Sequence, residues 1–229
     1  MRLDKFLCES SYFTRALAKR AIKSGKVTCD GVVVKDAGFK VQTKHRICYE
    51  GDELNLVGER FLMLHKPDGT VCATVDDVHP TVIDLLDIEK PEALHIAGRL
   101  DMDTTGLVLI TTDGQWSHRI TSPKKECGKC YLVTVADPLD AQLIETFAAG
   151  VALRNEDGLT KPARLEIIDS HTARLTITEG KYHQVKRMFA AVGNKVVGLH
   201  RESVGSIVLD DDLEPGEWRY LTEDEIKSV

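Results

Sequence analysis

Apolar side chains in the first 54 residues are spaced as in two short helices followed by a hairpin. Leu3, Phe6 and Leu7 stand at i, i+3 and i+4, which is the apolar stripe of a helix. Thr14 is a typical N-cap residue, so a second helix is expected to follow it and to end near the next glycine. Valine-containing runs then flank an Asp-Gly pair, the signature of a tight β-hairpin. Residues 1–54 are therefore predicted to form a small N-terminal domain.

Beyond a polar linker at residues 55–60, the pattern predicts a larger body of strands and helices over residues 61–229. The expected strands are apolar or alternating runs at residues 61–65, 107–112, 131–136, 163–168, 173–178 and 195–200. The expected helices are at residues 81–87, 114–121, 138–149 (with Pro138 in its first turn) and 183–192. The chain has no GxGxxG string and no P-loop. The order of elements therefore predicts an α+β fold rather than a Rossmann fold.

Charge is distributed unevenly between the two predicted domains. The chain has a formal net charge of −6, but residues 1–46 hold eleven Lys and Arg against four Asp and Glu. Their balance of +7 leaves −13 for the remainder. On the second predicted helix, Arg15, Lys19 and Lys23 recur every four residues and share one face, opposite an apolar side that includes Leu17. Such a stripe is usually only a solvated face, but on a basic domain it is also a candidate for phosphate contacts.

The sequence gives no indication of a membrane, a signal peptide or a metal site. It has no run of about eighteen apolar residues, as a membrane-spanning helix needs. The N-terminus lacks the apolar core of a signal peptide, which predicts a cytoplasmic protein with reduced thiols. Cys127 and Cys130 form a CxxC, but a structural zinc site needs four ligands, and no second CxxC or His pair stands at usable spacing. Both cysteines are therefore interpreted as incidental thiols beside a strand.

The run at residues 98–107, GRLDMDTTGL, places Asp101 on a loop between two glycines, ahead of a buried strand. Asp and Thr in such a loop usually bond local backbone amides, and that interpretation suits Asp103 and Thr104. Two carboxylates at i and i+2 on one loop do not flank a substrate bond from opposite faces, as glycosidase carboxylates do. The run as a whole resembles the GRLD signature of pseudouridine synthases, in which the Asp is the catalytic residue.

Three further segments resemble motifs of the same enzymes, in family order over about residues 60–205. Residues 61–69, FLMLHKPDG, are similar to the family's apolar strand followed by KPxG. Residues 129–134, KCYLVT, resemble a strand whose Tyr lies against the target base. Residues 178–188, TEGKYHQVKRM, resemble the segment that supplies a basic partner for the Asp.

The predicted N-terminal domain is similar to the S4 RNA-binding domain. It opens with RLDKF and carries GKVTCDG before the second arm of its hairpin. An S4-like domain joined to a pseudouridine-synthase-like body is typical of the RsuA family of pseudouridine synthases. The resemblance implies that the body is a mixed, largely antiparallel sheet with the active-site cleft across it.

The resemblance also implies a reaction, the isomerisation of uridine to pseudouridine in RNA. The C1′–N1 bond breaks, the freed uracil turns and it rejoins through C5, so no cofactor or metal is expected. Asp101 is the expected catalytic residue, as nucleophile at C1′ or as base at C2′. Lys186 is the expected cation that keeps it ionised, with Arg187 as the alternative. Tyr131 is expected to face the base that has left its stack. Substrate binding is expected from the cations Arg99, Arg187, Arg15, Lys19 and Lys23.

Within the family, residues 115–123 and 182–194 are most similar to members that act on the small ribosomal subunit, whereas large-subunit relatives more often read Asn-Arg-Gln. The implied substrate is one uridine of 16S rRNA (position 516 in the family), as naked RNA or in a partly assembled small subunit, and the enzyme is expected to be a monomer. The alternative is a synthase acting on 23S rRNA.

Two other classes of protein compete with this interpretation. They are an S4-type protein that binds RNA without chemistry and an N-glycosidase acting on a free nucleoside. The intact set of Asp101, Tyr131 and Lys186 argues against the first, and the basic N-terminal domain argues against the second. His183, beside the basic pair, is interpreted as a helix cap or surface group, and Trp116 as a packing residue.

Overall fold

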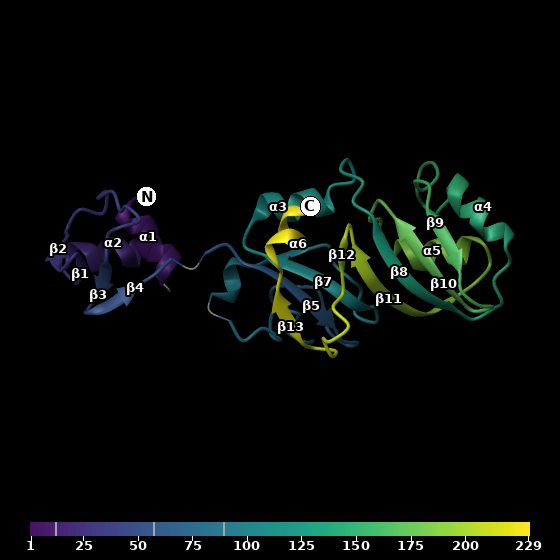
Figure 1. Ribbon diagram of the computed structural model, residues 1–229, viewed down its shortest axis with the longest axis horizontal. Coiled ribbons are helices and arrows are strands. Elements are labelled where there is room, and N and C mark those ends of the chain that lie inside the picture. The colour runs from purple at the N-terminus through teal and green to yellow at the C-terminus, as the bar shows by residue number, and fades with distance from the viewer. Residues whose placement is uncertain (12, 57, 89) are drawn as a thin grey trace. The chain divides into compact units, whose positions relative to one another are not determined.

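The computed structural model describes residues 1–11, 13–56, 58–88 and 90–229, which form two compact units, Met1–Gly58 and Glu59–Val229 (Figure 1). Residue 57 of the predicted linker lies outside the described residues. Arg60, which the sequence pattern assigns to the linker, is buried in the second unit, where its backbone N–H donates to Thr112 Oγ1 at 2.9 Å. The body therefore begins slightly earlier than predicted.

The first unit contains the predicted helices and hairpin. Its elements are α1 (Leu3–Ser10), α2 (Arg15–Lys23), β1 (Val27–Cys29), β2 (Val32–Val33), β3 (Ile47–Tyr49) and β4 (Asp52–Leu54). The strands form an antiparallel sheet in the order β2-β1-β3-β4. Thr14 caps α2, since its hydroxyl accepts a hydrogen bond from Leu17 N at 3.3 Å. The prediction for the Leu17 side chain was wrong: it is 41% exposed, because Ala18, Ala21 and Ile22 form the buried stripe and Leu17 lies at its edge.

The second unit is built on one mixed sheet. Its strands are β5 (Phe61–Lys66), β6 (His95–Ala97), β7 (Thr105–Thr111), β8 (Lys129–Val135), β9 (Arg164–Ile167), β10 (Thr172–Ile177), β11 (Val196–Val204), β12 (Ile207–Val208) and β13 (Trp218–Tyr220). The sheet runs β13-β5-β7-β11-β8-β10-β9, with β6 also paired to β7 and β12 to β11. The β7–β11 pair is parallel and the other described pairs of this sheet are antiparallel. The predicted α+β fold is confirmed.

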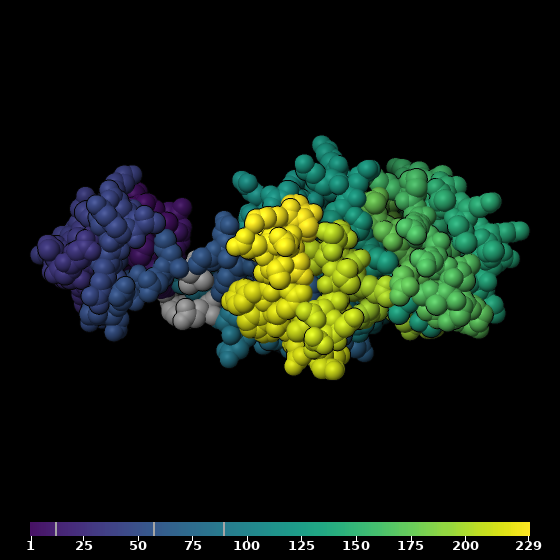
Figure 2. Space-filling model, viewed as in Figure 1, coloured from purple at the N-terminus to yellow at the C-terminus, as the bar shows by residue number. Residues whose placement is uncertain are grey.

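Helices cover both faces of this sheet. They are α3 (Gly114–Thr121), α4 (Gln142–Ala149), α5 (Gln184–Ala191), α6 (Glu223–Lys227) and a 3₁₀ turn at Pro91–Ala93. Phe147 of α4 and Phe189 of α5 pack edge to face within one apolar core, while Trp116 of α3 lies in a second core with part of α6. Trp116 Nε1 also donates to Ile226 O at 3.0 Å, which confirms it as a packing residue. Figure 2 shows the C-terminal residues (yellow) as a continuous part of this unit's surface.

One predicted helix of the body is absent and another begins later than predicted. Residues 81–87 form turns, closed by an i→i+3 hydrogen bond from Leu86 N to Ile83 O at 3.0 Å, because so short a run of helical spacing does not sustain a helix. The helix predicted at 138–149 begins only at Gln142, since Leu139 N donates to Ser170 O at 2.7 Å in the β9–β10 turn. Among the described residues, no helix is long and apolar enough to cross a membrane.

Gly106 permits the parallel contact between β7 and β11. Its φ of +106° lies in the region that favours glycine, and a Cβ there would stand 2.3 Å from Arg201 O. The two strands meet where Arg201 pairs with Gly106. A larger residue would push β11 away from β7, and β7 directly follows the loop that carries Asp101.

Candidate active site

A cavity of about 720 Å³ opens in the second unit around Asp101. Its walls come from the loop at residues 98–104, from β8 and β11, and from the segment at residues 180–186 that leads into α5. These segments are the ones whose sequences resemble pseudouridine synthase motifs. The sheet therefore brings separate motifs of the sequence to one cavity.

A buried lysine holds the Asp101 loop through hydrogen bonds to backbone carbonyl oxygens. Lys66, the last residue of β5, is fully buried, and its ammonium group donates to the carbonyl oxygens of Pro67, Met102 and Thr104 at 2.8–3.0 Å. Burial lowers the pKa of Lys66. Thr104 N also donates to Asp101 O at 3.1 Å, which closes the turn. The Asp101 carboxylate is thus held on a rigid backbone.

Lys186, in the first turn of α5, reaches Asp101. Its Nζ lies 3.1 Å from Asp101 Oδ2 and 2.6 Å from Asp103 Oδ1. Burial lowers the Lys186 pKa, but hydrogen bonds from Lys186 to the two carboxylates and their charges outweigh it, so the pKa is raised overall. The hydrogen bond from Lys186 lowers the pKa of Asp103. Asp103, which the sequence interpretation left as a loop brace, therefore shares the cation with Asp101.

His183 also approaches Asp101, which the sequence interpretation missed. Its Nε2 lies 3.4 Å from Asp101 Oδ1. His183 occupies the N-cap position of α5 in a left-handed conformation, with φ +46°, but makes no capping hydrogen bond through its side chain. The turn directs the ring towards the cavity instead of the helix end. A lone His before a helix carries no sequence signal for this contact.

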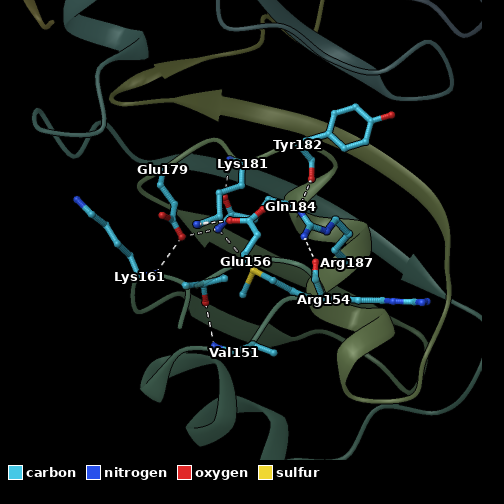
Figure 3. A network of polar contacts seen from close by, with 11 residues as sticks. Val151, Arg154, Glu156, Lys161, Glu179, Lys181, Tyr182, Gln184 and Arg187 are labelled. Atoms are coloured by element: carbon cyan, nitrogen blue, oxygen red, sulfur yellow. Dashed lines mark hydrogen bonds and ion pairs between the residues drawn. The ribbon is translucent and has the colours of Figure 1, made fainter. Parts of the chain in front are cut away.

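Arg187, the alternative partner predicted for Asp101, is engaged elsewhere. Its guanidinium donates to Glu156 Oε1 at 2.6 Å, to Arg154 O at 2.7 Å and to Tyr182 O at 3.0 Å (Figure 3). Glu156 also pairs with Lys181. The guanidinium thus ties the loop at residues 154–156 to the segment that carries Lys186. Arg187 does not line the cavity, and its role in binding substrate stays a prediction.

Tyr131 lies in β8, lines the cavity and is 7% exposed. Beside it is Arg201 of β11, which is 1% exposed and was not identified from the sequence. The Arg201 guanidinium donates to Leu107 O and Gly98 O, both at 2.8 Å, and to the Tyr131 hydroxyl at 3.5 Å. Arg201 therefore connects the tyrosine to the start of the Asp101 loop at Gly98 and to strand β7 that follows the loop. Cys130, the preceding residue, points to the other face of β8, where its Sγ meets Glu202.

The remaining predicted cations are exposed. Arg99 lies on the wall of the cavity. In the first unit, Arg15, Lys19 and Lys23 project from α2 into solvent, and Arg15 lies 3.6 Å from the buried carboxylate of Asp4.

Potential metal ligands gather at one place among the described residues. Cys29, Asp30 and His45 of the first unit have ligand atoms within 4.8 Å of one another. Cys127 and Cys130 are free thiols outside that group. The CxxC therefore takes no part in the only candidate ligand group of the described residues.

Comparison with known proteins agrees with this geometry. The sequence profile of the family described as RNA pseudouridylate synthase matches residues 60–191, and the S4 domain profile matches residues 1–47. The chain is 56% identical over 229 residues to the ribosomal small subunit pseudouridine synthase A of Vibrio cholerae, covering all of this chain and 99% of the relative. It is 57% identical over 230 residues to the protein of the same name from Escherichia coli (strain K12), covering all of both chains.

A solved structure matches along the whole length as well. It is described as a pseudouridylate synthase, with a TM-score of 0.72 and 51% identity over 100% of this chain and 99% of the other. The matches extend over both units and include every motif that forms the cavity. The chain belongs to the RsuA family of pseudouridine synthases, with an S4 domain followed by an RNA pseudouridylate synthase domain.

Proposed function

We propose that this enzyme converts one uridine of 16S ribosomal RNA to pseudouridine, at the position numbered 516 in the family's substrate. The observation that carries the proposal is the Asp101–Lys186 pair at the wall of a cavity. The relatives that match along the whole chain are named as small-subunit enzymes. Their names do not favour the alternative of a 23S rRNA substrate.

Asp101 is proposed to act on the ribose of the target nucleotide. Its carboxylate either attacks C1′ or removes the proton from C2′, and both routes need the ionised form. Lys186 places an ammonium group 3.1 Å from Asp101 Oδ2, where it donates a hydrogen bond to the carboxylate. After the C1′–N1 bond breaks, the detached uracil turns in the cavity and C5 joins C1′.

Tyr131 is proposed to contact the uracil base. Its side chain lines the cavity and is buried, and its hydroxyl accepts a hydrogen bond from Arg201 at 3.5 Å, so the ring has little freedom to move. A fixed aromatic ring gives the detached base a surface on which it can turn without leaving the site. The hydroxyl is the candidate group for assisting removal of the C5 proton to solvent once the new bond has formed.

RNA contacts outside the cavity are proposed for Arg99 and for the α2 stripe. The stripe consists of Arg15, Lys19 and Lys23, whose side chains are exposed. Exposed cations on a basic domain supply affinity for phosphates that does not depend on the base sequence. We expect the substrate to be 16S rRNA or a partly assembled small subunit, and the enzyme to act as a monomer in the cytoplasm.

Pseudouridine mapping on defined substrates tests the function. Purified enzyme is incubated with protein-free 16S rRNA, with 23S rRNA and with partly assembled small subunits, and pseudouridine is then mapped by carbodiimide modification and primer extension. We expect one new pseudouridine in the small-subunit substrates and none in 23S rRNA. Modification of 23S rRNA alone would instead support the large-subunit alternative.

A further inference from the structure

Tyr182 is an aromatic residue on the cavity wall that the proposed reaction does not use. It is 75% exposed, although it lies next to residues that reach Asp101. Within the described part of the chain its hydroxyl makes no hydrogen bond, and its ring points away from the neighbouring network of polar contacts (Figure 3). An aromatic side chain this exposed buries little apolar area, so folding alone does not account for its position.

The ring of Tyr182 is nevertheless held in a defined place. It stacks on His183 with 3.7 Å between the ring centroids and 21° between the planes. His183 in turn lies 3.4 Å from Asp101 Oδ1. Tyr182 is therefore only two contacts away from the proposed catalytic carboxylate, with one ring face covered by His183 and the other open.

The turn that carries the two rings is braced on several sides. Lys181 N donates to Gln184 Oε1 at 2.9 Å, and Gln184 Nε2 donates to Glu179 Oε1 at 2.8 Å. Arg187 binds the Tyr182 carbonyl at 3.0 Å, and Glu156 pairs with both Arg187 and Lys181 (Figure 3). A surface side chain on a braced turn loses less conformational entropy on binding than one on a loose loop.

An enzyme that takes a nucleotide out of its stack leaves the neighbouring base without a stacking partner, and an exposed aromatic ring can replace that partner. When the target nucleotide leaves its stack to enter the cavity, the neighbouring base loses a stacking partner. Aromatic rings restore that stacking for any base, because every base has a π-face. Tyr182 offers its open face at the wall of the cavity that receives the target nucleotide.

We propose that the stacked pair Tyr182–His183 is a binding platform for an RNA base, the one adjoining the target uridine. This proposal rests on the proposed function and adds a residue that holds the strand beside the target. The platform is a binding element and takes no part in the bond changes. Its contribution appears in the affinity for RNA and in KM.

The first test compares RNA affinity among three variants of the full-length enzyme. The probe is a synthetic 16S rRNA fragment that contains the target uridine. Stacking on an aromatic side chain corresponds to a roughly 5- to 150-fold change in Kd per base, so Tyr182→Ala is expected to weaken binding by a factor in that range. Tyr182→Phe keeps the ring and is expected to bind as the wild type does. Tyr220→Ala removes another exposed tyrosine, 53% exposed and outside the cavity lining, and serves as the control.

The second test identifies the base. The nucleotide on the 5′ side of the target and the nucleotide on its 3′ side are replaced in turn by an abasic nucleotide. Kd is measured for each fragment with wild-type enzyme and with Tyr182→Ala. Removal of one of the two bases should raise Kd for the wild type but leave Kd unchanged for Tyr182→Ala. A merely structural role of the tyrosine would not produce this difference. Equal Kd values for Tyr182→Ala and wild type, or abasic penalties that persist unchanged in the variant, would overturn the platform.

Failure of the platform is separable from failure of the proposed function. The same wild-type preparation is assayed for pseudouridine formation on the unmodified fragment. An active wild type with unchanged binding by Tyr182→Ala rejects only the platform. A wild type that binds the fragment but forms no pseudouridine in any small-subunit substrate rejects the proposed function itself.

Discussion

Replacement of Lys186 by methionine removes the cation beside Asp101 while keeping an unbranched side chain of similar length. The side chains of Lys186 and Asp101 are 26% and 30% exposed, so the pair is partly shielded from solvent. Its loss leaves the Asp101 carboxylate without the 3.1 Å hydrogen bond from an ammonium group. His183 remains at 3.4 Å but bears a charge only when it is protonated.

The expected loss of rate follows from the strength of that hydrogen bond. A hydrogen bond to a charged group contributes about 1.5–3 kcal/mol, which corresponds to a decrease of about 10- to 150-fold in the rate of the chemical step. Asp103 gives an internal comparison, because its side chain is 68% exposed and an exposed ion pair contributes at most about 1 kcal/mol. Asp103→Asn is therefore expected to lose no more than about fivefold.

The assay is single-turnover pseudouridine formation with enzyme in excess over 16S rRNA substrate, so that binding and product release do not limit the rate. Lys124→Met removes an exposed lysine outside the cavity lining and controls for a general loss of positive charge. Lys186→Arg keeps the charge and should recover part of the rate. A Lys186→Met enzyme that reacts as fast as Lys124→Met would refute the role given to Lys186.

Three further variants test other parts of the structure. Arg201→Met removes the hydrogen bonds from the buried guanidinium to Leu107 O and Gly98 O, so we expect a loss of about 2–4 kcal/mol in the free energy of unfolding and a fall in Tm of about 5–15 °C; an unchanged Tm would contradict this. The hydrogen bond from Arg219 lowers the Glu225 pKa to about 2, so the stability this pair provides is present above pH 4.5 and is lost as the pH falls towards 2. Glu225→Gln should be about 1–2 kcal/mol less stable than the wild type at pH 7 in urea unfolding, and the difference should shrink as the pH falls below 4.5. Replacing the whole α2 stripe by Gln should lower the log–log salt slope of RNA binding by roughly two to three, and an unchanged slope would mean that the stripe only aids solubility.

Much of the fold was predictable because it follows local rules. The spacing of apolar residues identified both helices of the first unit, and the Thr14 cap forms as expected. All six predicted strands of the body are present to within a few residues, because each is an apolar or alternating run. The error at residues 81–87 arose because the apolar spacing covers only about two helical turns, and a run that short closes as turns instead, with an i→i+3 hydrogen bond from Leu86 N to Ile83 O.

The site was less predictable, because its contacts join residues distant in the sequence. The sequence resemblance indicated Asp101, Tyr131 and Lys186, and the sheet brings all three to one cavity. The role of Arg201 could not be inferred from the sequence, because one of its hydrogen-bond partners is a carbonyl 103 residues away. The engagement of Arg187 was hidden for the same reason, since Glu156 lies 31 residues before it.

The central claim is that the Asp101 carboxylate performs the reaction, and Asp101→Asn tests it most directly because it keeps the shape of the side chain and removes its charge. Cells lacking the gene are supplied with wild-type enzyme, Asp101→Asn or Asp103→Asn at equal levels, and pseudouridine in their 16S rRNA is mapped. The wild type and Asp103→Asn should restore the modification, whereas Asp101→Asn should bind 16S rRNA with near wild-type affinity and form no pseudouridine. Pseudouridine above background with Asp101→Asn would contradict the account.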